Sequence, residues 1–265
     1  MKTHQLLVLA LIAVGLSACK QECTTGGTSK EASASAATRE VASSSVSIEC
    51  SEPSQPSPGE PPVTNPPQTE PEKPYSFHPL LWESVRSEGK AWSAYLHELI
   101  EKDLGNDLLA GSEDIETFCP RYHTLNNKQR VNFWGLLISA MTKYESAHNP
   151  LSRMQETTMG TDPVTKKPVY SEGLLQLSYQ DIQWAPYCEF DWEKDKNLSP
   201  TDPKKTILDP YKNLNCGTRI FARQIRNKRN IAVKSGAYWS VLIPGGKYTK
   251  VTQISDLTKK LPGCQ

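Results

Sequence analysis

The sequence has almost no excess of charge of either sign. Its 30 lysine and arginine residues nearly balance 29 aspartate and glutamate residues, which leaves a formal net charge of +1 over 265 residues. Nucleic-acid binding usually needs a basic surface that neutralises phosphates. The basic residues between Arg219 and Arg229 are typical of a solvated helix face instead. We therefore expect no nucleic-acid partner.

Metal-binding patterns are also missing. Neither Cys-x-x-Cys nor His-x-x-x-His occurs, so the spacing typical of zinc sites is absent from the sequence. Asp191, Glu193 and Asp195 alternate as the early ligands of a calcium loop do. Lys196 and Asp202, however, stand where that loop needs a glycine and a closing glutamate. We expect no metal and no cofactor, and we interpret the acidic run as a solvated loop.

Apolar runs long enough to span a membrane are lacking as well. The run Leu6–Leu16 is too short, and with Lys2 before it and small residues after it, the pattern is typical of an export signal over residues 1–18. Leu16-Ser17-Ala18-Cys19 resembles the lipobox of bacterial lipoproteins, which implies a lipid on Cys19 and a membrane anchor. Because Lys20, not aspartate, follows, we expect an outer-membrane lipoprotein that faces the periplasm. The alternative is a soluble secreted protein.

Large apolar residues are scarce again over residues 19–74. Serine, alanine, threonine, glutamate and proline dominate this stretch, which cannot bury enough surface to offset chain entropy. We predict a disordered tether whose proline-rich second half is semi-stiff. Residues 75–265 are long enough for one domain with a sizeable core.

Four of the seven cysteines lie in the predicted domain, at Cys119, Cys188, Cys216 and Cys264. In an exported domain, four cysteines fit two disulfides with three possible connectivities. We favour Cys188 with Cys216, because they are close in sequence. The second pair, Cys119 with Cys264, would then fasten the far end of the chain to the body.

Helical periodicity dominates the domain, and a short irregular stretch interrupts it. Between Pro150 and Ser171 the turn signals predict a small hairpin. The fold class expected is therefore mainly α with a small β-hairpin (α+β). The helices predicted from apolar spacing are His78 to Arg86, Lys90 to Leu104, Asn126 or Asn127 to Glu145, Tyr211 to Asn230, Ser235 to Leu242 and Thr252 to Leu261.

Glu145 ends an apolar helical stripe. Val131, Trp134, Ile138 and Met141 recur at helical spacing, and Glu145 follows Met141 by four residues, so its carboxylate leaves the helix on the buried face. Burial and the carbonyls at a helix end both disfavour the charged form and raise the pKa of the carboxyl. A general acid needs such a shift. The alternative is a glutamate that turns back to water at the end of the helix.

Four short segments occur in an order that resembles the soluble lytic transglycosylase and goose-type lysozyme family. The resemblance covers residues 131–242 and implies a lysozyme-like fold with a substrate groove for peptidoglycan. The segments are Tyr144-Glu145-Ser146-Ala147-His148-Asn149-Pro150, Gly173-Leu174-Leu175-Gln176-Leu177-Ser178, Asn213 through Gly217 to Phe221, and Ala237-Tyr238.

The sequence departs from the family pattern in three places. Leu175 replaces the usual methionine, and Trp239 replaces the usual asparagine, which puts that contact in doubt. The stretch between Glu145 and Gly173 is longer than in compact members, so we expect Met154 to Tyr170 to form an inserted hairpin over the groove.

By this resemblance Glu145 would protonate the β-1,4 glycosidic oxygen between N-acetylmuramic acid and N-acetylglucosamine. We expect the lytic transglycosylase route, in which the sugar's own 6-hydroxyl closes a 1,6-anhydro ring. The alternative is a hydrolytic, inverting lysozyme, whose second carboxylate lies about 6.5 to 9.5 Å from the first. Glu156 is the first candidate for that role, followed by Asp162 and Glu172.

The resemblance also implies roles for smaller polar groups. Tyr238 would hydrogen-bond and orient Glu145, and Ser146, Ser171 and Gln176 would contact sugar or position the acid. Alternatively, Tyr238 is an ordinary core tyrosine and the other three are local capping groups. A catalytically inactive wall-binding module is the remaining alternative from another functional class.

Overall fold

The computed structural model describes residues 75–265, and the predicted export signal, the lipidation at Cys19 and the tether lie outside the described residues. Within 75–265, the protein is mainly helical with one two-stranded antiparallel sheet, as predicted. No helix of this part is both long and apolar enough to cross a membrane. The α-helices are α1 (Gly89–Asp103), α2 (Gly105–Leu108), α3 (Ile115–Phe118), α4 (Asn127–Glu145), α5 (Trp192–Asp195), α6 (Pro210–Lys228) and α7 (Val251–Thr258); the strands are β1 (Arg153–Gln155) and β2 (Tyr170–Glu172).

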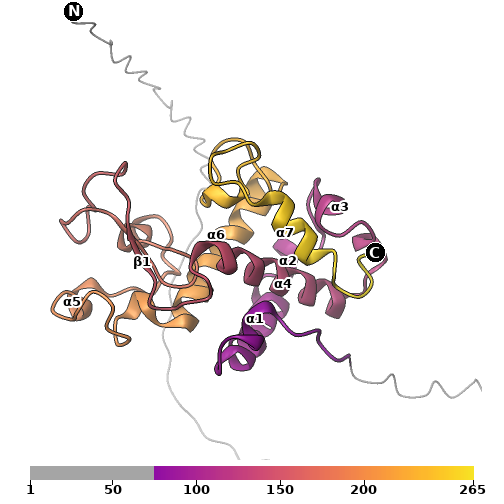
Figure 1. The fold of residues 1–265 in the computed structure, drawn as a ribbon, viewed down its shortest axis with the longest axis horizontal. Coiled ribbons are helices and arrows are strands. Elements are labelled where there is room, and N and C mark those ends of the chain that lie inside the picture. The colour runs from indigo at the N-terminus through magenta and orange to yellow at the C-terminus, as the bar shows by residue number, and fades with distance from the viewer. Residues whose placement is uncertain (1–74) are drawn as a thin grey trace, which may run out of the picture. The chain divides into compact units, whose positions relative to one another are not determined.

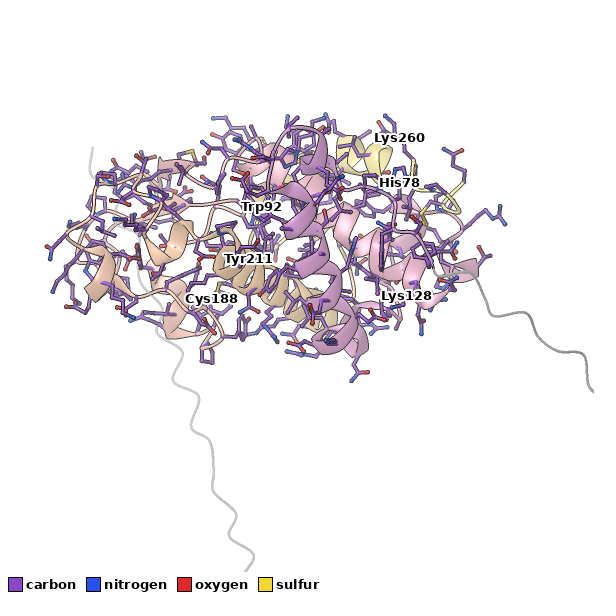
Figure 2. The ribbon with its side chains drawn as sticks, turned by 90° about the horizontal axis from the view of Figure 1, so that it is seen from below. His78, Trp92, Lys128, Cys188, Tyr211 and Lys260 are labelled. Atoms are coloured by element: carbon purple, nitrogen blue, oxygen red, sulfur yellow. A yellow bond between two sulfur atoms is a disulfide. The ribbon has the colours of Figure 1, made fainter. Side chains whose placement is uncertain are left out.

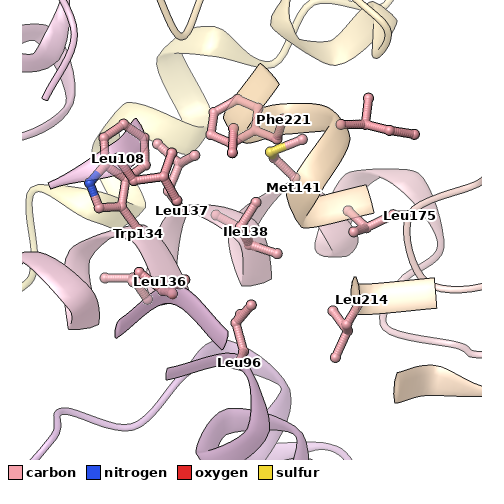
Figure 3. Packing of buried hydrophobic residues seen from close by; sticks show 14 of the residues in the cluster. Leu96, Leu108, Trp134, Leu136, Leu137, Ile138, Met141, Leu175, Leu214 and Phe221 are labelled. Atoms are coloured by element: carbon pink, nitrogen blue, oxygen red, sulfur yellow. The ribbon is translucent and has the colours of Figure 1, made fainter. Parts of the chain in front are cut away.

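Helix α4 runs through the middle of the described chain, between α1 and α7 (Figure 1). Asn126 caps it: the side-chain oxygen accepts from the amide of Gln129, whose side chain accepts from the amide of Asn126. Its predicted apolar stripe is fully buried, and Figure 3 shows Trp134, Ile138 and Met141 packed with Leu175 and Phe221. Because nearly every turn of α4 is buried, the helix is fixed in the core, and so is the position of Glu145 at its end.

Helix α6 brings a second buried face to the same core. Asp209 caps its start by accepting from the amides of Tyr211 and Lys212, and Pro210 occupies the first turn, where no amide hydrogen is needed. Arg229, in the left-handed region with φ 59°, ends it. The predicted stripe of Leu214, Thr218, Phe221 and Ile225 is fully buried. Helix α1 carries Trp92, labelled in Figure 2, which is also buried.

Both predicted disulfides are confirmed. Cys119 pairs with Cys264 across 145 residues, and Cys188 pairs with Cys216 across 28, each with Cα atoms 4.6 Å apart. By loop-closure entropy the two bridges stabilise the fold by up to about 5 and 3.5 kcal/mol respectively.

Two helix predictions were too long. Of His78 to Arg86, only Leu81–Ser84 is helical, as one 3-10 turn (η1). Of Ser235 to Leu242, only Ser240–Leu242 forms a 3-10 turn (η5), because Gly236 takes a left-handed φ of 73° that breaks a helix.

The interpretation of the acidic run as a solvated loop was wrong for Asp195. That side chain is buried and accepts from the hydroxyls of Tyr179 (2.7 Å) and Thr206 (2.5 Å) and from the amide of Thr206. Asp195 therefore joins the short helix α5 to the segment after it. No cluster of metal-ligating side chains occurs within residues 75–265.

Candidate functional site

Glu145 is the last residue of α4, and the chain turns sharply after it. Ala147 and His148 both take left-handed backbone angles, with φ 52° and 59°, and the amides of Ser146 and His148 both donate to the carbonyl of Thr142. This closure satisfies the helix end and fixes the position of Glu145. The Glu145 side chain is half-buried, and its Oε1 atom is buried with no hydrogen-bond partner within residues 75–265.

The pKa of Glu145 is raised from 4.5 to about 7. Burial is the larger cause, as the sequence predicted, and the negative charge of Glu156 is the second. Glu145 therefore keeps its proton to a higher pH than an ordinary carboxyl does. A general acid needs this property, because it must hold a proton and be able to release it.

Glu156 lies in the hairpin, and its negative charge acts on Glu145. In the pairing of β1 with β2, Met154 lies opposite Ser171. Glu156 is the first residue after β1, so this register brings it near Ser171. The Ser171 hydroxyl donates to Oε1 of Glu156 at 2.6 Å, and the amide of Glu156 donates to the carbonyl of Val169. Ser171 therefore positions the second carboxylate.

The other two acidic candidates are engaged elsewhere. Asp162 is buried and accepts from the Ser178 hydroxyl and the amides of Val164, Thr165 and Gln180. Glu172 is buried in an ion pair with Lys205, whose side chain is also buried. Both carboxylates hold the hairpin against the body, which leaves Glu156 as the candidate for the second acidic role.

The loop after β2 is held from behind by two residues of α6. The Asn213 side chain accepts from the amide of Leu175 and donates to the carbonyls of Glu172 and Ile207. One turn later, Gly217 leaves room for Leu175, since a Cβ there would lie 2.4 Å from Leu175 Cδ1. Asn213 and Gly217, one helical turn apart, therefore both fix the loop, and we call these two residues the clamp.

Ser146 and Gln176 are bonded to backbone. The Ser146 hydroxyl donates to the carbonyl of Leu174 at 2.8 Å, which joins the end of α4 to the loop. The Gln176 amide donates to the carbonyl of Gly173 at 2.8 Å, and Gln176 itself is in the left-handed region with φ 50°. The bond of Gln176 is local, as the alternative interpretation predicts for this residue, whereas the bond of Ser146 spans 28 residues.

The prediction that Tyr238 hydrogen-bonds Glu145 was wrong. Its hydroxyl donates to Oδ2 of Asp181 at 2.5 Å, a partner that the sequence pattern did not indicate. Burial and the charge of Asp181 raise the pKa of Tyr238 well above its ordinary value, and the negative charges of Glu145 and Glu156 add to this shift. The neighbouring Trp239 is buried, and its indole N–H donates to the carbonyl of Leu175 at 2.8 Å. The departure from asparagine at 239 thus supplies another anchor for the loop.

A surface hollow of about 340 Å³ has Tyr238 in its wall. Trp184, which is 41% exposed, lines it together with the basic side chains of Arg223 and Lys228. Neither Glu145 nor Glu156 lines this hollow. The groove beside Glu145 therefore stays a prediction.

Comparison with solved structures finds similar chains. The wild-type form 2 of DslA (Bd0314) is 32% identical over 70% of this chain and 97% of its own, with a TM-score of 0.57. The chain belongs to the DslA family. A scan against models of protein families gives no match, and neither does a search of the curated proteins.

Two further DslA structures match equally well, and each is a glutamate-to-glutamine mutant. They are 32% and 30% identical to this chain, and each has a TM-score of 0.58. The two glutamates substituted in DslA are 11 positions apart. Glu145 and Glu156 have the same separation, 156 minus 145.

Proposed function

We propose that this protein cleaves the glycan strand of peptidoglycan, with Glu145 as the general acid. The observation that carries the proposal is the pairing of two carboxyl groups from separate elements, one of which has a pKa of about 7. Glycosidic cleavage needs an acid that stays protonated in this range and a second group that is ionised. The four segments that resemble the soluble lytic transglycosylase and goose-type lysozyme family supply the substrate class.

A lysozyme-like fold with a groove is part of the same proposal. In its favour, α4 ends at Glu145, and the hairpin brings Glu156 to it from another direction. The hollow around Tyr238 would continue the groove: the exposed indole of Trp184 offers a flat apolar face for a sugar ring, and Arg223 and Lys228 offer positive charge to the carboxylates of the wall polymer.

Of the two chemical routes, hydrolysis has the stronger support. The sequence led us to expect a lytic transglycosylase, which needs no second carboxylate. Glu156, however, is held by Ser171 close enough to Glu145 to raise its pKa. A carboxylate in that position can activate water. The spacing shared with the glutamates substituted in DslA supports a joint role for this pair. Transglycosylation with a 1,6-anhydro product remains the second candidate.

We further propose that the domain acts at the periplasmic face of the outer membrane, to which a lipid on Cys19 would anchor it through the residue 19–74 tether. The two disulfides support the exported location, since such bridges persist in oxidising compartments.

Digestion of purified sacculi tests the proposal, with released muropeptides measured by mass spectrometry. The hydrolytic route predicts reducing-end products, whereas transglycosylation gives products lighter by one water. Glu145→Gln should abolish release, while Glu116→Gln, at an exposed site on α3, should leave it unchanged. If the wild-type protein binds sacculi and releases nothing, it is a wall-binding module and the enzymatic proposal is wrong.

A further inference from the structure

The basic residues of α6 fall into two groups. Three of them form ion pairs with acidic residues of other segments: Lys212 with Glu189, Arg219 with Asp103 and Arg226 with Asp107. Arg223 and Lys228 have no acidic partner within residues 75–265, and both line the hollow of about 340 Å³. No aspartate or glutamate occurs between Pro210 and Ser255, so the chain supplies none beside them in sequence. The positive charge left without a partner on this helix therefore lies at the hollow.

The hollow combines these two cations with an aromatic surface. The guanidinium of Arg223 lies over the ring of Trp184, 5.3 Å from its centroid, and donates to the carbonyl of Trp184 at 3.4 Å. Because a guanidinium has five N–H donors, most of them stay free for a ligand. A Cβ on Gly236 would lie 3.6 Å from Nζ of Lys228, so this ammonium group lies beside the turn that leads to Tyr238.

The walls of the hollow are held in place by buried hydrogen bonds. The buried Gln224 side chain donates to the carbonyls of Asn230 and Ile231, which fixes the end of α6. Tyr238 donates to the buried Asp181, whose Oδ2 also accepts from the amide of Ser178. That carboxylate is thus engaged by these two donors, and no hydrogen bond or ion pair joins it to Arg223 or Lys228 within residues 75–265.

The hollow and the end of α4 are supported by the same loop. Trp239, which follows the tyrosine of the hollow, donates to the carbonyl of Leu175 at 2.8 Å. Ser146, which follows Glu145, donates to the carbonyl of Leu174 at 2.8 Å. Because these two carbonyls are adjacent in the chain, a polymer bound at the end of α4 can extend to the hollow.

We propose that the hollow is a carboxylate subsite that binds the peptide carried by the wall glycan, with Arg223 and Lys228 on a carboxylate and Trp184 on an apolar part of the peptide. The inference rests on the proposed function and narrows its substrate to strands that carry peptide. A neutral sugar would leave both positive charges without a partner. A peptide carboxylate can accept two parallel hydrogen bonds from a guanidinium, the arrangement that arginine favours.

Titration of a wall tripeptide, alanyl-γ-glutamyl-diaminopimelate, into the full chain tests the subsite. The readout is the NMR signal of the Trp184 indole N–H, assigned by its loss in Trp184→Phe. Arg223→Gln and Lys228→Gln should each weaken the Kd about tenfold, since each removes a hydrogen bond to a charged group. Arg226→Gln removes the same charge from the same helix outside the hollow and should leave the Kd unchanged. Arg223 and Lys228 are exposed, so their variants should stay folded, which thermal unfolding checks.

Two further probes separate charge from mere contact. The same tripeptide with its carboxylates amidated should bind at least tenfold more weakly than the free acid. A chain of N-acetylglucosamine, which has no carboxylate, should give the same small response in the wild type and in Arg223→Gln. The proposal is overturned if the tripeptide does not bind, if its amidated form binds equally well, or if Arg223→Gln binds it with wild-type affinity.

The binding measurement requires no cleavage. Absence of glycan cleavage by the wild-type protein would therefore sink the proposed function and leave the binding result standing. Where cleavage is observed, Arg223→Gln should raise KM about tenfold on peptide-bearing strands and leave kcat unchanged, because the subsite binds ground state and transition state alike. Strands whose peptides an amidase has removed keep a carboxylate on the sugar alone, and on them KM should not change. An equal rise on both strands would assign the hollow to the sugar carboxylate and contradict the peptide subsite.

Discussion

Ser171 and Glu156, which come from the two sides of the hairpin, are joined by a hydrogen bond of 2.6 Å from the serine hydroxyl to the glutamate carboxylate. Since Glu156 is half-buried and the remainder of the hairpin tip is largely exposed, this bond is what gives the second carboxylate a defined position.

Removal of that bond should reduce catalysis without unfolding the protein. Ser171→Ala removes a hydrogen bond that contributes about 1 to 1.5 kcal/mol. If this free energy is lost from the transition state, kcat on sacculi should fall about tenfold. Ser199→Ala, at an exposed site, is the control. Both variants should stay folded at the assay temperature, and unchanged kcat in Ser171→Ala would mean that Glu156 needs no such support.

The charge of Glu156 should set part of the pKa of Glu145. Glu156→Gln removes the second cause of the raised pKa, so the Glu145 midpoint should fall below 7 while burial keeps it above 4.5. Carbon-13 NMR of the carboxyl measures this shift. Glu189→Gln, which changes an exposed glutamate paired with Lys212, should leave the midpoint in place. A midpoint that does not move in Glu156→Gln would show that the two carboxyls are not coupled.

The raised pKa of Glu145 should also appear in the pH dependence of stability. Between about 4.5 and 7 the folded state holds a proton that the unfolded state has lost, so wild-type stability falls as pH rises through this window. Glu145→Gln removes that dependence. At pH 8 it should be more stable than the wild type by about 3 to 3.5 kcal/mol, from a shift between 4.5 and about 7 at about 1.4 kcal/mol per pKa unit.

Urea unfolding of both proteins at pH 4 and pH 8 measures the difference. The gain at pH 8 should largely disappear at pH 4, where Glu145 is protonated in both states. An equal difference at the two pH values would contradict the assignment of a raised pKa to this residue.

Gly173 should tolerate no side chain. It has a φ of 80°, and a Cβ would lie 2.2 Å from Asn213 Nδ2 and 3.0 Å from the carbonyl of Ile207. Gly173→Ala should therefore cost more than 2 kcal/mol of stability. Gly160→Ala is a matched control, because its φ is a similar 73° but nothing lies within 4 Å. Equal unfolding midpoints for the two variants would mean that the Asn213 clamp yields easily.

The parts of the fold that the sequence predicts well depend on local patterns. Helix α4 follows from the capping residue Asn126 and an apolar stripe that repeats every turn, and the hairpin follows from its turn signals. The short helices α2, α3 and α5 were not predicted, because one turn of helix has no stable periodicity of its own and forms only when the surrounding structure packs on it.

The site divides in the same way. Burial of Glu145 follows from its place in the stripe, whereas the partner of Tyr238 does not, since Asp181 is 57 residues away and no pattern links them. The roles of Asp162 and Glu172 were equally out of reach. Both are acidic residues in a polar segment, and their burial depends on Ser178 and Lys205 coming to them in three dimensions.

The clamp of Asn213 and Gly217, together with Trp239, has a consequence for redesign. All three hold the segment 172–175 from its inner side, through backbone atoms and the buried Leu175 side chain. The residues that anchor this segment are thus different from those on its outer, exposed side. Substrate preference could accordingly be altered by exchanging exposed hairpin residues such as Met154 and Met159, with little penalty in folding.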